Sequence, residues 1–343
     1  MDSKALELHS RATVVVGHDH TTLGIAMRRE RGERAVFSNH YIPLIYRGGV
    51  NVIGLVVGGD RPSPLPEGDS PWWRLLSLVD MLWQEVEESG DTTSICLNGR
   101  DIDTAITEGK IALLMTMEGA RPLSQSLLSE SLVPLRTLCR LGIRGIQLIG
   151  GYWNPLVDAP DDAETTAGLT GFGKAVVQEM NRLGMVIDVA HVPDPDPMFW
   201  DVIEVSQDPV IDSHHSVRAV NDIPSCLSDE RIKAIARKGG VIGMHFASHW
   251  VNEAVEQATL DDLVRHIDHI VELVGVDHVG LGPDFAEVEL VGLVTDEYYV
   301  KEVTGLDQLP RVTEALVERG YSDADILKIL GENLLRVYRQ VIG

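Results

Sequence analysis

The stretch LTGFGKAVVQEMNRLGMVIDVAH, from Leu169 to His191, contains one complete helix–strand unit. Thr170 is a typical N-cap, apolar residues follow at helical spacing, and Gly184 is a typical stop. The next residues, GMVIDVA, form a short apolar run rich in β-branched side chains, and the run ends at His191. The pattern predicts a helix from Thr170 to Gly184 and then a buried strand with a histidine at its exit.

The same unit recurs along the chain. Eight apolar runs are separated by longer stretches of helical character: ATVVVG (from residue 12), GVNVIGLVVG (49), KIALLMTM (110), GIRGIQLIG (142), GMVIDVA (184), DPVIDS (208), GGVIGMHF (239) and DHVGLG (277). Strands that are apolar throughout are typical of a parallel sheet buried on both faces. Eight strands alternating with helices predict an α/β fold of the (β/α)8 TIM barrel class.

The domain organisation follows from the absence of a break in composition. We expect residues 1–343 to form a single (β/α)8 barrel domain, with closing helices in the C-terminal stretch DADILKILGENLLRVYRQV. The proline-rich segment 59–71 follows the second strand and is interpreted as a long loop of the barrel.

Charge and cysteine content exclude several classes of partner. The net charge is −23, with 52 acidic against 29 basic residues, and such a surface repels nucleic acid and anionic membranes. The three cysteines are far apart, which favours a reducing compartment. The N-terminus has no apolar signal region, and the longest apolar stretch is about half of a membrane span. We expect a cytoplasmic protein with no nucleic-acid or membrane partner.

Ionisable residues follow five of the predicted strands. The stretch VVVGHDH illustrates this, because alternation along a strand points His18 and His20 the same way. In barrel enzymes, the C-terminal ends of the strands carry the active site. The residues expected at that rim are His18, His20, Glu118, His191, His214 and Asp284.

The residue types at this rim point to metal chemistry. A single histidine on an apolar strand is usually a core residue, but the same coincidence at five strand ends favours a metal site. Imidazoles with carboxylates suit Zn²⁺, and Mn²⁺, Fe²⁺ and Co²⁺ are alternatives. Six groups exceed the needs of one tetrahedral ion, so we expect two divalent ions that share a carboxylate and hold a hydroxide between them.

Neighbouring residues were also considered. His215 is expected to point away from the site, whereas His245 and His249 could line the pocket. Gly280 and Gly282 share a strand face with Asp284, which predicts open room beside its carboxylate.

A nucleotide-cofactor oxidoreductase is disfavoured because GLTGFG lacks the order G-x-G-x-x-G.

Several motifs resemble those of the membrane (renal) dipeptidase family of the amidohydrolase superfamily. They are GKIALLMTMEG, GLTGFGKAVVQEMNRLGMVIDVAH, PVIDSHHSVRAV, GGVIGMHF, HVGLGPDF and GENLLRVY, and the likeness covers most of the chain. The resemblance implies zinc-dependent hydrolysis and is compatible with a homo-oligomer. It also implies roles for seven residues: His18 and His20 as first-strand ligands, Glu118 as the bridging carboxylate, His191 and His214 as ligands of the second ion, Asp284 as the acid/base, and Arg218 as the anchor for a substrate carboxylate.

Three positions depart from the family pattern. His20 replaces the usual aspartate, which raises the positive charge at that ion by one unit. Gly150 stands where a substrate-contacting histidine is usual, and the neighbouring Tyr152, Trp153 or Asn154 could substitute for it. Ala286 replaces a second aspartate. A retained metal scaffold with an altered pocket indicates a change of substrate.

The leading hypothesis is a dipeptidase-like hydrolase that depends on two metal ions, most simply Zn²⁺. A hydroxide bridging the ions would attack an amide carbonyl of a small carboxylate-bearing substrate, with Glu118 and Asp284 as catalytic groups. Arg218 would anchor the carboxylate, with Tyr152 and Asn154 as further substrate contacts; alternatively, Arg218 pairs with Asp222. Two other readings stay open: the enzyme hydrolyses a non-peptide bond (C–C, lactone or another amide), or the barrel binds ligands without catalysis.

Overall fold

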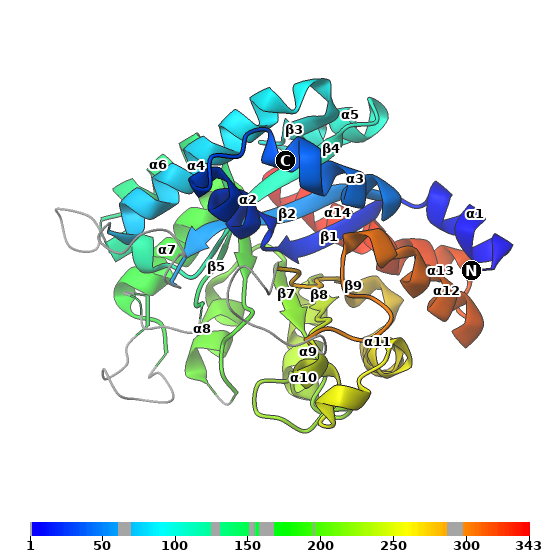
Figure 1. Cartoon of the computed structure of the whole chain (residues 1–343). Coiled ribbons are helices and arrows are strands. Elements are labelled where there is room, and N and C mark those ends of the chain that lie inside the picture. The colour runs from blue at the N-terminus through cyan, green and yellow to red at the C-terminus, as the bar shows by residue number, and fades with distance from the viewer. Residues whose placement is uncertain are drawn as a thin grey trace.

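A computed structural model describes residues 2–60, 70–124, 131–150, 154, 156–157, 168–194, 196–286 and 298–343. Its centre is a ring of parallel strands surrounded by helices (Figure 1). The ring closes because β1 pairs with β9 at Val16 and Leu281. The predicted TIM barrel is therefore confirmed.

All eight predicted strands are present and follow one another around the barrel. They are β1 (Val14–Asp19), β2 (Val50–Gly59), β4 (Ile111–Glu118), β5 (Ile143–Gln147), β6 (Val186–Asp188), β7 (Val210–His215), β8 (Val241–Met244) and β9 (Val279–Leu281). The short strand β3 (Thr93–Ile95) was not predicted. It pairs only with the first half of β4, and β5 pairs with the second half, so β3 lies outside the closed ring.

The helices pack around the barrel and at its N-terminal end. They are α1 (Ser3–Arg11), α2 (Thr21–Glu30), α3 (Ile42–Arg47), α4 (Pro71–Glu88), α5 (Gly99–Thr107), α6 (Val133–Leu141), α7 (Gly171–Leu183), α8 (Pro197–Val205), α9 (Asp229–Arg237), α10 (Ser248–Val251), α11 (Leu260–Val274), α12 (Pro310–Arg319), α13 (Asp323–Leu327) and α14 (Asn333–Ile342). Two π-helical segments are η1 (Phe37–Tyr41) and η7 (Lys328–Glu332).

The predicted limits of α7 are confirmed by its caps. The Thr170 hydroxyl accepts the N–H of Gly173 at 2.9 Å. Gly184 ends the helix in the left-handed conformation with φ 66°, which a residue without a side chain adopts at low cost. The C-terminal stretch DADILKILGENLLRVYRQV contains the helices α13 and α14. Among the described residues, no helix combines the length and apolarity needed to cross a bilayer.

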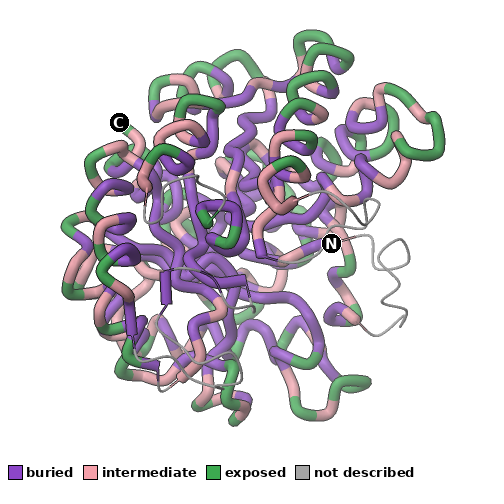
Figure 2. Tube along the Cα trace, turned by 90° about the vertical axis from the view of Figure 1, so that its left-hand side faces the viewer, coloured by how far each residue is buried: buried purple, intermediate pink, exposed green. Residues whose placement is uncertain are grey.

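The buried apolar residues form an outer and an inner cluster. The buried segments lie in the middle of the molecule and the exposed ones at its periphery (Figure 2). Val14 and Val16 of β1 belong to the outer cluster, between the strands and the surrounding helices. Val15 points the other way, into an inner cluster that includes Leu334 and Tyr338 of α14. The helix α14 thus covers the N-terminal end of the barrel. The interior is filled with side chains, because the cavity beneath the strand ends measures only about 20 Å³.

A local irregularity in β1 turns the first predicted ligand inward. The pairing register between β1 and β2 shifts between Val16 and Asp19. At this shift, side chains of β1 no longer alternate strictly between the two faces of the strand. We refer to this register shift as the slip in β1. Gly17 and His18 consequently both line the small interior cavity. Without the slip, the alternation that places Val15 inside would place His18 outside.

Candidate metal centre

Four polar side chains converge at the C-terminal ends of β1, β4 and β9. The Nε2 atom of His20 lies 3.1 Å from Glu118 Oε2 and 3.1 Å from Asp284 Oδ1. His18 Nε2 lies 3.3 Å from His20 Nε2 and 3.4 Å from Asp284 Oδ1. The slip in β1 and the straight alternation of β4 both direct these groups into the barrel mouth.

His191 faces the other oxygen of Glu118. His191 Nε2 lies 3.3 Å from Glu118 Oε1, and His214 Nε2 lies 3.0 Å from His191 Nε2. The two carboxylate oxygens therefore face two different histidines, His20 and His191. This is the arrangement expected of a carboxylate that two cations share.

The donor set fits divalent cations. Two groups of ligand atoms lie within 4.8 Å of one another, namely His18–His20–Glu118 and His18–His214–Asp284. Nitrogen lone pairs 3.0 to 3.3 Å apart repel one another unless a proton or a metal cation lies between them. Imidazole nitrogens with carboxylate oxygens are the donors that Zn²⁺ and related ions accept. The two groups are consistent with a binuclear site.

The protonation states agree with this reading. Burial lowers the pKa of His18 to about 3 and that of His214 well below its usual value, so both imidazoles are neutral and able to bind a metal. Burial also acts to lower the pKa of His20, but Asp284 and Glu118 outweigh it and raise that pKa to about 10. A proton on His20 thus compensates the two carboxylates, and a cation would displace it.

Backbone conformation singles out two of these residues. In the part of the chain that the structure describes, the non-glycine residues with positive φ are Ala35, His191 and Asp284. His191 has φ 64° and Asp284 has φ 58°, values that cost free energy in residues with a side chain. Such strain persists where the surroundings enforce it, and it concentrates at functional sites.

Two supports of Asp284 were not predicted from the sequence. The Tyr299 hydroxyl donates to the Asp284 carbonyl at 2.9 Å and accepts the Ala286 N–H at 2.8 Å. His245 was considered only as a pocket-lining residue. Its Nδ1 accepts the N–H of Ala247 at 3.0 Å, so its Nε2 carries the proton and faces Asp284 Oδ2 at 3.3 Å.

The sequence of residues 70–342 matches the family model described as membrane dipeptidase (peptidase family M19). The chain belongs to the membrane dipeptidase family. The predicted resemblance to this family is thereby confirmed.

Individual relatives extend the comparison. The chain is 33% identical over 264 residues to dipeptidase tcpJ of Claviceps purpurea (strain 20.1), a match that covers 77% of this chain and 59% of that protein. The chain therefore spans less than two thirds of that relative.

Solved structures share the fold. The probable dipeptidase PvdM from Pseudomonas aeruginosa has a TM-score of 0.80 at 23% identity, over 98% of this chain and 97% of that chain. A metallo peptidase from Rhodobacter sphaeroides, liganded with a phosphinate mimic of the dipeptide L-Ala-D-Ala, has a TM-score of 0.80 at 21% identity, over 96% of this chain and 99% of that chain.

Gly150, the position at which the resemblance implies a substrate-contacting histidine, is crowded by neighbouring backbone. A Cβ on Gly150 would lie 2.6 Å from the carbonyl oxygen of Glu118 and 3.2 Å from Cβ of Asp60. Asp60 Oδ2 accepts the Gly150 N–H at 2.9 Å. The backbone around position 150 therefore leaves no space for any side chain, so a glycine is required there.

Of the residues that were expected to compensate for Gly150, Tyr152 and Trp153 lie outside the described residues. Asn154 is completely buried. Its amide donates to Asp60 Oδ2 at 3.2 Å and to the Leu148 carbonyl at 2.9 Å, and its oxygen accepts the Leu156 N–H at 3.0 Å. These bonds hold the chain after β5 and engage both polar atoms of the Asn154 side chain, whose substrate contact stays a prediction.

The predicted anchor Arg218 has a different partner from the one considered. Its Nη1 pairs with Asp194 Oδ2 at 2.9 Å, and Nη2 and Nε donate to the carbonyls of Pro224 and Ile223. Its ion pair in the structure is therefore with Asp194 and not with Asp222. About a quarter of the side chain is exposed, which keeps it accessible to a ligand.

The glycines before Asp284 serve packing and not the carboxylate. A Cβ on Gly282 would lie 1.7 Å from the Ser213 carbonyl oxygen, and one on Gly280 would lie 3.0 Å from Leu334. There is thus no open room at these two glycines, because the neighbouring strand and α14 fill it.

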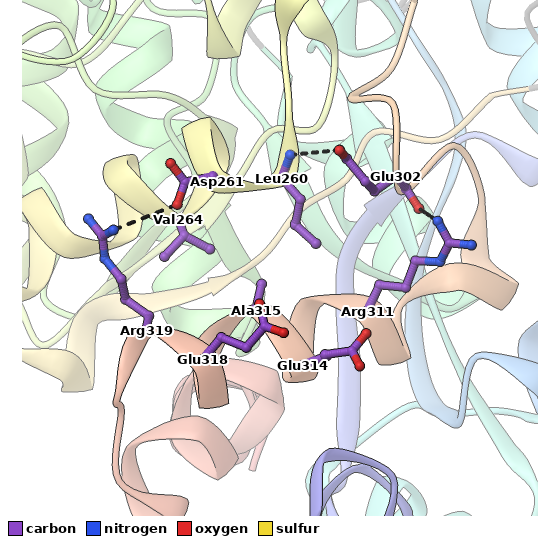
Figure 3. A pocket seen from close by; sticks show the side chains of 9 residues that line it. All are labelled: Leu260, Asp261, Val264, Glu302, Arg311, Glu314, Ala315, Glu318 and Arg319. Atoms are coloured by element: carbon purple, nitrogen blue, oxygen red, sulfur yellow. Dashed lines mark hydrogen bonds and ion pairs between the residues drawn. The ribbon is translucent and has the colours of Figure 1, made fainter. Parts of the chain in front are cut away.

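A cavity of about 550 Å³ lies away from the metal centre (Figure 3). It is open to the surface between α11, α12 and Glu302. Arg319 pairs with Asp261, and Arg311 donates to the Glu302 carbonyl. None of the candidate ligands lines this cavity, so its size does not make it the candidate active site.

Proposed function

We propose that this protein is a binuclear metallohydrolase that cleaves an amide bond of a small carboxylate-bearing substrate, most simply a dipeptide. The observation that supports the proposal is the position of Glu118, which has one oxygen beside His20 and the other beside His191. The dipeptide mimic bound to the structural relative from Rhodobacter sphaeroides suggests the substrate class.

The proposal assigns six residues to the ions. His18, His20 and Asp284 would hold the first, His191 and His214 the second, and Glu118 both. Zn²⁺ is the ion that this donor set favours. When bound, such ions polarise a carbonyl group and acidify water.

The protein groups supply positioning and proton transfer. Asp284 is the proposed proton acceptor and donor, because it lies at the site and His245 and Tyr299 fix its orientation. Arg218 is the proposed anchor for the substrate carboxylate, since a guanidinium can hold a carboxylate through two N–H groups. Binding in that way would require the substrate to replace or share the contact with Asp194.

A second candidate is hydrolysis of a non-peptide bond at the same centre. The crowding at Gly150 favours it, because no side chain at this position can donate to a tetrahedral oxyanion. Loss of one such donor can reduce a rate by ~10²–10³. A substrate with a better leaving group or a more reactive carbonyl would tolerate that loss.

Metal analysis and a substrate panel test both candidates. Elemental analysis of the purified protein should find two divalent ions per chain, and chelation should abolish hydrolysis of L,L- and L,D-dipeptides. A matched pair of variants is His20→Ala at the site and His40→Ala at the surface, where the imidazole pairs with Glu33. Only His20→Ala should lose metal. Metal without dipeptide hydrolysis would favour the second candidate, and a protein that binds no metal would refute both.

A further inference from the structure

A serine hydroxyl lies between ligands assigned to different ions. Ser213 belongs to β7 and is buried. Its Oγ lies 2.8 Å from Nδ1 of His214 and 3.3 Å from Nδ1 of His18. His18 and His214 are 196 positions apart in the chain, and the closed barrel brings both to one oxygen atom.

The hydrogen atoms in this contact can be counted. His18 and His214 face the metal centre with Nε2. A neutral imidazole that binds a cation through one nitrogen carries its hydrogen on the other, so both Nδ1 atoms are donors. The Ser213 oxygen has two lone pairs and can accept both.

Asp188 holds the backbone of Ser213 in place. Its Oδ1 accepts the N–H of Ser213 at 3.0 Å and that of Ala190 at 3.0 Å. A buried carboxylate therefore fixes the backbone of the residue whose hydroxyl contacts both imidazoles.

We propose that Ser213, supported by Asp188, is a positioning residue that couples the two ion sites. The inference rests on the proposed metal-dependent function. An ion at either site fixes the Nδ1 hydrogen of its histidine, and this orients the shared hydroxyl for the histidine of the other site. Partners that orient ligand histidines typically change metal affinity 10–100-fold. Here one such partner serves both sites.

Ser216 provides a matched control, because it is also a buried serine just beyond the same strand. It is completely buried, yet its Oγ has no hydrogen-bond partner within the described part of the chain. Each alanine substitution removes one buried hydroxyl group. Only the Ser213 hydroxyl is hydrogen-bonded to ligand histidines in the described part of the chain.

Zinc retention tests the proposal. Zinc-loaded protein is dialysed against graded zinc-buffered chelator, and the bound ions are counted at each free Zn²⁺ concentration. For Ser213→Ala, we expect the midpoints of both ions to move to ~10–100-fold higher free Zn²⁺, whereas Ser216→Ala retains the wild-type midpoints. Ser213→Thr keeps the hydroxyl and should restore binding. Ser213→Cys, with a weak acceptor of similar size, replaces the alanine variant if that variant does not fold.

A spectroscopic readout separates positioning from packing. In ¹⁵N-histidine-labelled zinc protein, the Nδ1–H signals of His18 and His214 should both shift in Ser213→Ala and remain in place in Ser216→Ala. Wild-type midpoints in Ser213→Ala, or an equal loss in Ser216→Ala, would overturn the inference and leave the proposed function standing. A wild-type protein that retains no zinc would refute both.

Discussion

Substitution of Gly150 by alanine tests whether the backbone, and not only the missing histidine, defines this site. The added Cβ would lie 2.6 Å from the carbonyl oxygen of Glu118, whereas ordinary contacts begin at 3.4 Å. One of the two segments must therefore move by about 0.8 Å. Neither the added Cβ nor the Glu118 carbonyl oxygen belongs to a flexible side chain. The backbone at the end of β4 or after β5 must therefore shift.

The Gly150→Ala substitution is expected to lower both the stability of the fold and the rate of hydrolysis. Overpacking of this kind costs about 1–3 kcal/mol of unfolding free energy, which corresponds to a fall in Tm of ~2–6 °C. The displacement also moves Glu118, whose carboxylate lies 3.1 and 3.3 Å from His20 and His191. Misplacement by about 1 Å can reduce activity ~10²-fold, and we expect a loss of hydrolysis of about that size.

Thermal unfolding, zinc content and hydrolysis rate are measured together. The matched control is Gly171→Ala in the first turn of α7, where an added Cβ meets nothing within 4 Å. This variant should keep the wild-type Tm or exceed it slightly. The reasoning is refuted if Gly150→Ala matches the control in stability and activity, because the Glu118 carbonyl would then not confine this position.

Three further predictions concern side chains. Arg218→Met should raise KM ~10–100-fold with little change in kcat, since charge-assisted hydrogen bonds contribute about 1.5–3 kcal/mol; an unchanged KM would limit Arg218 to its ion pair. His245→Phe should lower kcat with zinc content unchanged, and His245→Gln, which keeps an N–H for Asp284, should retain more activity; equal losses would contradict the assigned hydrogen bond. Arg182 and Arg136 lower the pKa of Glu179 to about 2, so this ion pair stabilises the fold above about pH 4.5 and is lost as the pH falls towards 2. Glu179→Gln should cost about 1 kcal/mol in urea unfolding at pH 7 and nearly nothing at pH 2; a cost independent of pH would exclude the ionic cause.

The strand pattern was predictable because burial on both faces leaves a strong signal. Each barrel strand is covered by helices outside and by side chains inside, so its residues are apolar throughout. The strand β3 gave no such signal, because it is three residues long and pairs along only half of β4. Both ends of α7 were predictable from the sequence. Thr170 and Gly184 cap the helix through contacts with residues in the adjacent turn, so no distant part of the chain is needed to define its limits.

The candidate ligands were also visible in the sequence, since parallel strands all end at the same side of a barrel. The sequence could place His18, Glu118 and Asp284 on one rim without any knowledge of distances. The contacts of Asn154 and Arg218 were not predictable. Their hydrogen-bond partners depend on the conformations of loops, and loop conformations leave no periodic pattern in the sequence.

The sequence by itself determined the barrel and the polar residues at its mouth, because both follow from local patterns of burial and alternation. Tertiary structure decided which atoms meet. The slip in β1 turns His18 inward, the crowding at Glu118 excludes a side chain at Gly150, and ring closure brings His18 and His214 to Ser213. These contacts join segments far apart in the chain, and their geometry is fixed only when all eight strands pack against one another.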